Sequence, residues 1–170
     1  MKKCLLLGLS VFLLIFIIKV TGIRFNYTNS MPIGFYIKLK TIAVHNGDTV
    51  AACLPNKIGK IGLENHYLAR GSCSNGSVPV LKKVIAIPGD SVSINNQFIT
   101  VNNLFYPAPR QTKDNHGHHV EKVIRNGRYF STNSYWLYGA NDPIDSWDSR
   151  YYGGVTRQHI IGVYKSFLPL

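Results

Sequence analysis

The sequence predicts a mainly β domain made of many short strands, preceded by one N-terminal transmembrane helix. Beyond residue 24, short apolar runs recur, and clusters of Gly, Asn, Asp and Pro separate them. This alternation is the pattern of an all-β domain. A tight hairpin turn is expected at Asn95-Asn96, and a single short helix is expected at 58–67. The expected strands cover 35–39, 49–54, 80–87, 91–94, 98–101, 135–138 and 160–167.

Residues 106–128 form the most polar stretch of the chain and are expected to be a long loop. Three histidines in this stretch, His116, His118 and His119, suggest a metal site. No carboxylate or cysteine cluster joins them, so we expect neither a metal ion nor a cofactor.

The N-terminal segment is expected to anchor the chain in a membrane. The uncharged run Cys4–Ile18 would span only about 22 Å as a helix, which is short of a hydrocarbon core of about 30 Å. The gap closes if Lys3 and Lys19 reach toward the two interfaces. A cleaved signal peptide is the alternative. We expect residues 1–24 to be an anchor in a bacterial inner membrane, and residues 25–170 to be a periplasmic domain.

The net charge of +11, from 19 basic and 8 acidic residues, suits either nucleic acid or an anionic membrane surface. The basic residues are scattered along the chain rather than clustered. We therefore expect the inner membrane, and no nucleic acid, as a partner.

In an oxidising compartment Cys53 and Cys73 are candidates for a disulfide, and two free buried thiols are the alternative.

A serine close to the expected anchor is the first candidate for chemistry. Ser30 lies ten residues beyond Val20, so it can stand no more than about 35 Å from the end of the anchor. In an extended strand, Thr28 and Ser30 would point to the same side. The Thr28 hydroxyl could then help the Ser30 N–H to hold an oxyanion. An ordinary loop is the alternative for this segment.

A lysine in an apolar strand is the second candidate. Both Lys82 and Lys83 alternate with apolar residues in the run 80–87, so at least one of them is expected in a dry environment. Burial lowers the pKa of a lysine, and a neutral amine can take a proton from a serine hydroxyl. Periodicity does not decide between the two lysines, and an edge strand with both amines in water is the alternative.

A polar turn near the C-terminus is the third candidate. Asp148 and Arg150 can form an ion pair across one residue if the backbone is extended. Such a pair would stiffen the loop that carries Ser146, whose hydroxyl could orient a lysine amine. A solvated polar loop is the alternative.

In this order, the segments resemble the type I signal peptidase family. That family has a serine followed by Met and Pro, a Gly-Asp-x-Val strand, an apolar lysine-bearing strand ending in Pro-Gly-Asp, and a Ser-x-Asp-Ser-Arg box. The resemblance covers most of residues 28–163 and implies an antiparallel, barrel-like β fold with a Ser–Lys dyad. The matching segments are Ser30-Met31-Pro32, Gly47-Asp48-Thr49-Val50, Lys82-Lys83 with Pro88-Gly89-Asp90, and Ser146-Trp147-Asp148-Ser149-Arg150.

The resemblance also implies a role for each matching residue. The implied roles are Ser30 as nucleophile, Lys82 as general base, Thr28 with the Ser30 N–H as oxyanion hole, Ser146 as the residue that orients the lysine, and Asp148 with Arg150 as a structural pair. Gly139-Ala140-Asn141-Asp142 matches the family's Gly-Asp-Asn-Arg only in part.

Several features are closer to the conjugative-transfer branch, the TraF-type peptidases. They include Pro32-Ile33-Gly34-Phe35-Tyr36 and the Tyr151-Tyr152-Gly153 that follows Arg150. This resemblance implies a preprotein substrate, in particular a conjugative pilin. A housekeeping signal peptidase and a non-enzymatic, membrane-tethered β binding module are the alternatives. The sequence leaves open whether the reaction ends in hydrolysis, by water, or in cyclisation or transpeptidation, by an amine.

Overall fold

The computed structural model describes residues 22–169. The expected membrane anchor at 1–24 therefore lies almost entirely outside the described residues. Within residues 22–169, no helix combines the length and the apolar character needed to cross a bilayer.

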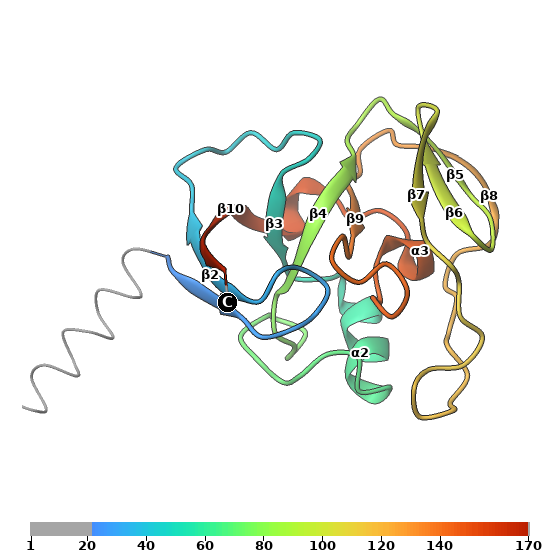
Figure 1. Ribbon diagram of the computed structural model, residues 1–170, viewed down its shortest axis with the longest axis horizontal. Helices are drawn as coiled ribbons and strands as arrows, with labels where there is room; N and C mark the ends of the chain where they lie inside the picture. The colour runs from blue at the N-terminus through green and yellow to red at the C-terminus, as the bar shows by residue number, and fades with distance from the viewer. Residues whose placement is uncertain (1–21, 170) are drawn as a thin grey trace, which may run out of the picture.

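The described residues form two antiparallel sheets, which confirms the mainly β prediction (Figure 1). The larger sheet has the order β1 (Arg24–Asn26), β2 (Gly34–Lys38), β10 (Ile160–Pro169), β3 (Thr49–Ala52), β4 (Val80–Ala86) and β9 (Trp136–Tyr138). The smaller sheet has the order β7 (Leu104–Pro107), β6 (Phe98–Val101), β5 (Ser91–Ile94) and β8 (Gly127–Phe130). Because β1 and β9 stand at the two ends of its order, the larger sheet is an open half-barrel and not a closed barrel.

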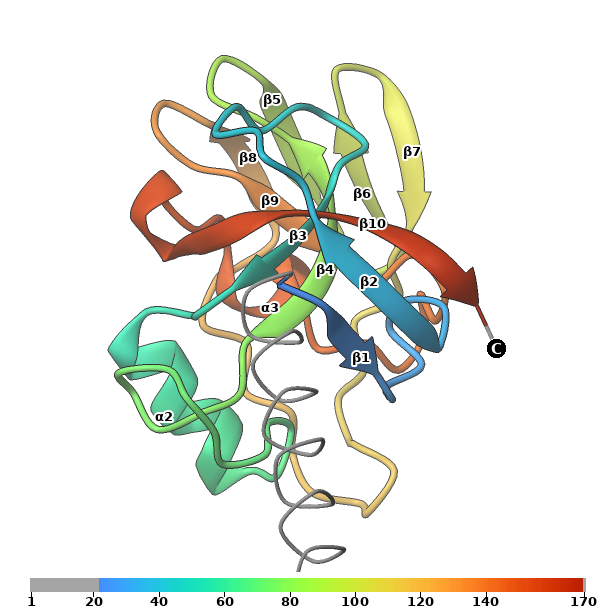
Figure 2. The same cartoon turned by 90° about the vertical axis from the view of Figure 1, so that its left-hand side faces the viewer.

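Within residues 22–169, three short helices complete the fold: α2 (Asn56–Glu64), α3 (Ser149–Tyr152) and η1 (Arg157–His159). The smaller sheet lies beside the β4–β9 end of the larger one, and α2 lies at the opposite side of the molecule (Figure 1). Figure 2 shows β1, β2 and β10 from the front, with β3 and β4 behind them. The predicted helix at 58–67 is thus present but begins and ends a few residues earlier.

Two apolar clusters stabilise this arrangement, and β4 contributes to both. Val84 packs with Val50, Leu137 and residues of α2 in one cluster. Ile85 packs with the inward side chains of the smaller sheet in the other. Along β4, Val80, Lys82 and Val84 on one face and Ile85 on the other face are buried, whereas Leu81 and Lys83 are only half-buried. A polar side chain at position 82 therefore lies in an apolar environment.

Cys53 and Cys73 form a disulfide, with an S–S distance of 2.02 Å. The bond ties the end of β3 to the long connection between α2 and β4. Much of the predicted polar loop at 106–128 is irregular, with one isolated bridge between Lys113 and His119. Its first two residues belong to β7 and its last two to β8, because strand pairing with β6 and β5 extends into it.

Candidate active site

Ser30 lies in a turn that follows β1 directly. The expectation of an extended strand at Thr28 and Ser30 was wrong, because residues 28–31 bend back on themselves. The bend is held by the side chain of Asn26, whose Nδ2 donates to the carbonyl oxygens of Thr28 at 2.9 Å and Met31 at 2.9 Å. The Thr28 hydroxyl donates to Asn26 Oδ1 at 2.9 Å. Sequence reasoning missed Asn26, because nothing in the local pattern distinguishes it from other asparagines in loops.

Of the two lysines on β4, Lys82 is the buried one, with 3% of its surface exposed. Lys83 is only half-buried. Lys82 shares its face of β4 with Val80 and Val84, and it pairs with Val50 across the sheet. The structure therefore shows that Lys82, and not Lys83, is the lysine in the dry environment.

Burial lowers the pKa of Lys82 from its ordinary value of 10.5 to about 8. Desolvation is the largest cause, and the charge of Arg150 acts in the same direction, whereas Asp148 and Asp142 partly oppose it. An amine with this pKa is partly neutral near physiological pH, as a general base must be.

The ends of the Ser146 and Lys82 side chains lie close together beside Gly139. A Cβ atom on Gly139 would overlap the Ser146 hydroxyl and would lie 3.3 Å from the Lys82 Nζ. The Ser146 Oγ is buried, and it has no hydrogen-bond partner among residues 22–169. The Ser146 hydroxyl and the Lys82 amine thus lie near the same point beside Gly139, and no hydrogen bond joins them.

We expect Gly139→Ala to lower catalytic activity by about 100-fold, because displacement of a catalytic group by roughly 1 Å has an effect of this size. Gly139 is outside the left-handed backbone region, so the effect would come from crowding against Ser146 and Lys82. Turnover of a peptide substrate measures it, with the exposed neighbour as control in Ala140→Ser. Equal activity in Gly139→Ala and wild type would show that the space above Gly139 is not needed.

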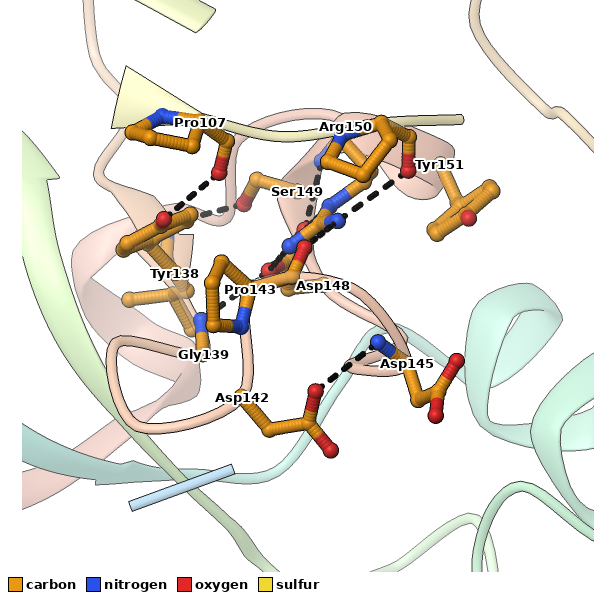
Figure 3. Close-up of polar contacts among 12 residues, drawn as sticks. Pro107, Tyr138, Gly139, Asp142, Pro143, Asp145, Asp148, Ser149, Arg150 and Tyr151 are labelled. Atoms are coloured by element: carbon orange, nitrogen blue, oxygen red, sulfur yellow. Dashed lines mark hydrogen bonds and ion pairs between the residues drawn. The ribbon is translucent and has the colours of Figure 1, made fainter. Parts of the chain in front are cut away.

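Asp148 and Arg150 form a buried ion pair that contacts Gly139 (Figure 3). Both side chains are fully buried, and Asp148 Oδ2 lies 2.8 Å from an Arg150 terminal nitrogen. The same Oδ2 accepts a hydrogen bond from the Gly139 N–H at 2.9 Å. Arg150 also donates to the Pro143 carbonyl oxygen. The pair therefore holds the loop 139–146 at Gly139 and at Pro143.

The pair forms by a different geometry from the one expected. The extended backbone assumed from the sequence was wrong at Arg150, because residues 149–152 form the short helix α3. Asp148 caps this helix, and its Oδ1 accepts hydrogen bonds from both the Arg150 N–H and the Arg150 Nε. A capping aspartate places its carboxylate over the first helical turn, where the Arg150 side chain meets it.

The loop 139–146 also contacts the turn that carries Ser30. The Asn141 N–H donates to the Ser30 carbonyl oxygen at 3.1 Å, and Asn141 Nδ2 donates to the Asn29 carbonyl oxygen at 3.0 Å. This single loop thus contacts the Ser30 turn on one side and lies beside Lys82 on the other.

A groove of about 640 Å³ has Ser30, Thr28 and Lys82 in its walls. Ala51 and Leu81 are among the apolar residues that line it. The structure therefore brings three of the sequence-predicted site residues to one groove, with Ser146 beside Lys82 and the ion pair in contact with Gly139. Over residues 22–169, no three His, Cys, Asp or Glu side chains are grouped so that they could hold a metal ion.

Comparison with known proteins identifies the family to which this chain belongs. A model of the family described as signal peptidase, peptidase S26, matches residues 2–168. The chain belongs to this family.

Individual relatives share most of the length of the chain. It is 31% identical to "Plasmid transfer protein TraF" of Escherichia coli over 151 residues, which cover 86% of this chain and 83% of the relative. It is 26% identical to "Conjugal transfer protein TraF" of Agrobacterium fabrum, with 84% and 80% covered. Among solved structures, a signal peptidase I from Enterococcus faecalis aligns with a TM-score of 0.38 and 18% identity, over 71% of this chain and 96% of that one.

Proposed function

We propose that this chain is a membrane-anchored serine endopeptidase that matures exported preproteins, with a conjugative pilin as its substrate. The observation that carries the proposal is the presence of a buried Lys82, with a pKa lowered to about 8, in the wall of the same groove as Ser30. The catalytic domain would lie on the periplasmic side of the inner membrane, anchored by residues 1–24. The names of the TraF relatives support a role in conjugation.

The first half of the proposed reaction forms an acyl-enzyme. Neutral Lys82 takes the proton of the Ser30 hydroxyl, and the Ser30 Oγ attacks the carbonyl carbon of the scissile peptide. The resulting oxyanion is bound by the Ser30 N–H and by the Thr28 hydroxyl, which turns away from Asn26 Oδ1. As the C–N bond breaks, the Lys82 ammonium gives its proton to the departing amine.

The second half releases the product. Lys82 takes a proton from water, the water oxygen attacks the Ser30 ester, and Ser30 recovers its proton as the new carboxylate leaves. An amine in place of water gives a peptide bond and therefore a cyclic or transferred product. Ser146 orients the Lys82 amine in both halves, and the Asp148–Arg150 pair holds the loop on which Ser146 lies.

The experiment is acylation of the full-length protein in detergent by a serine-directed inhibitor, with the labelled residue located by mass spectrometry. The proposal predicts one label, at Ser30, that disappears in Ser30→Ala and persists in a Ser91→Ala control. No label at Ser30 in the wild type would favour the non-enzymatic binding module.

Co-expression with a candidate pilin precursor tests the substrate class. Mass spectrometry is expected to show shortened pilin with the wild type and unprocessed precursor with Ser30→Ala. Cleavage of general secretory preproteins, with the pilin precursor left intact, would instead identify a housekeeping signal peptidase.

A further inference from the structure

We infer that Asn26 is a positioning residue for the nucleophile. Its carboxamide holds residues 28–32 in the conformation that presents Ser30 and Thr28 to the groove. This inference rests on the proposed function of Ser30. The observation behind it is a set of hydrogen bonds that accounts for every backbone carbonyl of this turn.

Five consecutive carbonyl oxygens, from Thr28 to Pro32, accept hydrogen bonds. Asn26 Nδ2 contacts three of them, those of residues 28, 31 and 32, at 2.9, 2.9 and 3.0 Å, so its two hydrogens are shared among the three acceptors. Asn141 donates to the two between, at 3.0 and 3.1 Å. The Tyr36 hydroxyl donates to the Pro32 carbonyl at 2.8 Å.

These hydrogen bonds engage the carbonyl oxygens of the turn but not the Ser30 N–H, and this difference affects the electrostatics around the nucleophile. All five carbonyl oxygens are engaged by donors within the protein, and these donors offset the partial negative charge of the carbonyl groups next to the nucleophile. Among the residues described, none accepts a hydrogen bond from the Ser30 N–H. The turn therefore keeps this donor free for the substrate, which is the preorganisation that an oxyanion site requires.

Only a neutral carboxamide can make the observed contacts at position 26. Its Nδ2 donates to the carbonyl oxygens, while its Oδ1 accepts from the Thr28 N–H at 3.3 Å and from the Thr28 hydroxyl at 2.9 Å. The side chain is 7% exposed, and its backbone is fixed by pairing with Gly34 on β2. A carboxylate at this position would keep the acceptor but would face the carbonyl oxygens without donors.

Measurement can distinguish a positioning role of Asn26 from an effect of Asn26 on the pKa of Lys82. Asn26 is not among the charged groups that shift the pKa of Lys82, which are Asp148, Arg150 and Asp142. Loss of its carboxamide should therefore lower the rate of acylation and leave its pH midpoint unchanged. It should also leave binding of the acylating probe before reaction almost unchanged, because the apolar wall that contains Ala51 and Leu81 stays in place.

The test compares Asn26→Ala and Asn26→Asp with wild type and with Asn95→Ala, in full-length protein in detergent. Asn95 is a matched control, because its side chain organises the β5–β6 turn in the smaller sheet. We expect both Asn26 variants to lower the first-order rate of Ser30 acylation by about 100-fold, as a roughly 1 Å misplacement does. The apparent dissociation constant of the probe and the pH midpoint in Asn26→Ala should stay at their wild-type values. Asn95→Ala should acylate like the wild type.

A second readout does not depend on catalysis. NMR order parameters of residues 28–32 should fall from about 0.85 to below about 0.6 in Asn26→Ala, while those of the β-sheets are retained. Acylation of Asn26→Ala at the wild-type rate would overturn the inference. If the wild type itself is not acylated, the proposed function fails, and unchanged order parameters in Asn26→Ala would then also exclude Asn26 as the residue that holds the turn.

Discussion

Replacing Lys82 with methionine is expected to reduce peptide cleavage by at least about 10⁴-fold, the scale on which single members of a serine-peptidase catalytic unit act. Methionine fills a similar volume but offers no amine to accept the Ser30 proton. The matched control is Lys83→Met, because Lys83 is the next residue on β4 and is only half-buried. Cleavage of a fluorogenic peptide measures both variants, and we expect Lys83→Met to retain activity.

The same substitution at Lys82 is expected to stabilise the fold. Folding lowers the pKa of Lys82 from 10.5 to about 8, so below pH 8 the folded protein holds a buried charge that the unfolded chain keeps in water. Stability of the wild type should therefore rise with pH between about 8 and 10.5. The pKa difference corresponds to about 3 kcal/mol at neutral pH. Urea unfolding at pH 7 and pH 10 tests this, and a Lys82→Met variant that cleaves normally or is less stable at pH 7 would contradict the account.

Removing Asp148 should have the largest effect on stability. Its carboxylate neutralises Arg150 where both side chains have no exposed surface, and it accepts the Gly139 N–H as well. Breaking a buried ion pair by removing one partner costs about 3–5 kcal/mol, because the other charge is left uncompensated. We expect Asp148→Ala to lower the free energy of unfolding by this amount and to abolish cleavage.

A double variant separates the effect of the uncompensated Arg150 charge from the effect of losing the hydrogen bonds that Asp148 accepts. Asp148→Ala with Arg150→Met removes both charges, so it should recover part of the stability that Asp148→Ala alone loses. Urea unfolding of the wild type, both single variants and the double variant provides the measurement. If the double variant is less stable than Asp148→Ala, the uncompensated charge of Arg150 is not the main cause.

Sequence reasoning predicted the strands that carry their own apolar pattern and missed those that depend on a partner. The run at 80–87 is apolar enough to be read directly, and it corresponds to β4. In contrast, β8 is a short strand, Gly127–Phe130, that exists because it pairs with β5. The strand β1 likewise depends on β2. Pairing between distant segments is a tertiary effect that local propensity does not contain.

The candidate site shows the same division between features that the sequence pattern reveals and features that depend on tertiary contacts. The box that contains Ser146, Asp148 and Arg150 could be found from its residues and their order. The choice of Lys82 over Lys83 depends on which face of β4 meets the apolar cluster around Val84. The contribution of Asn26 depends on hydrogen bonds to carbonyl groups two to six residues further along, which become visible only when the turn is built.

The central claim is that a neutral Lys82 activates Ser30, and the pH dependence of Ser30 acylation tests it most directly. The measurement uses a probe whose own reactivity does not vary with pH, with Ser30→Ala as the background. We predict that the rate rises about tenfold per pH unit below 8 and levels off above it, since the neutral fraction of an amine with a pKa of about 8 follows this course. A rate that does not change with pH, or one that still rises steeply up to pH 10, would contradict the account.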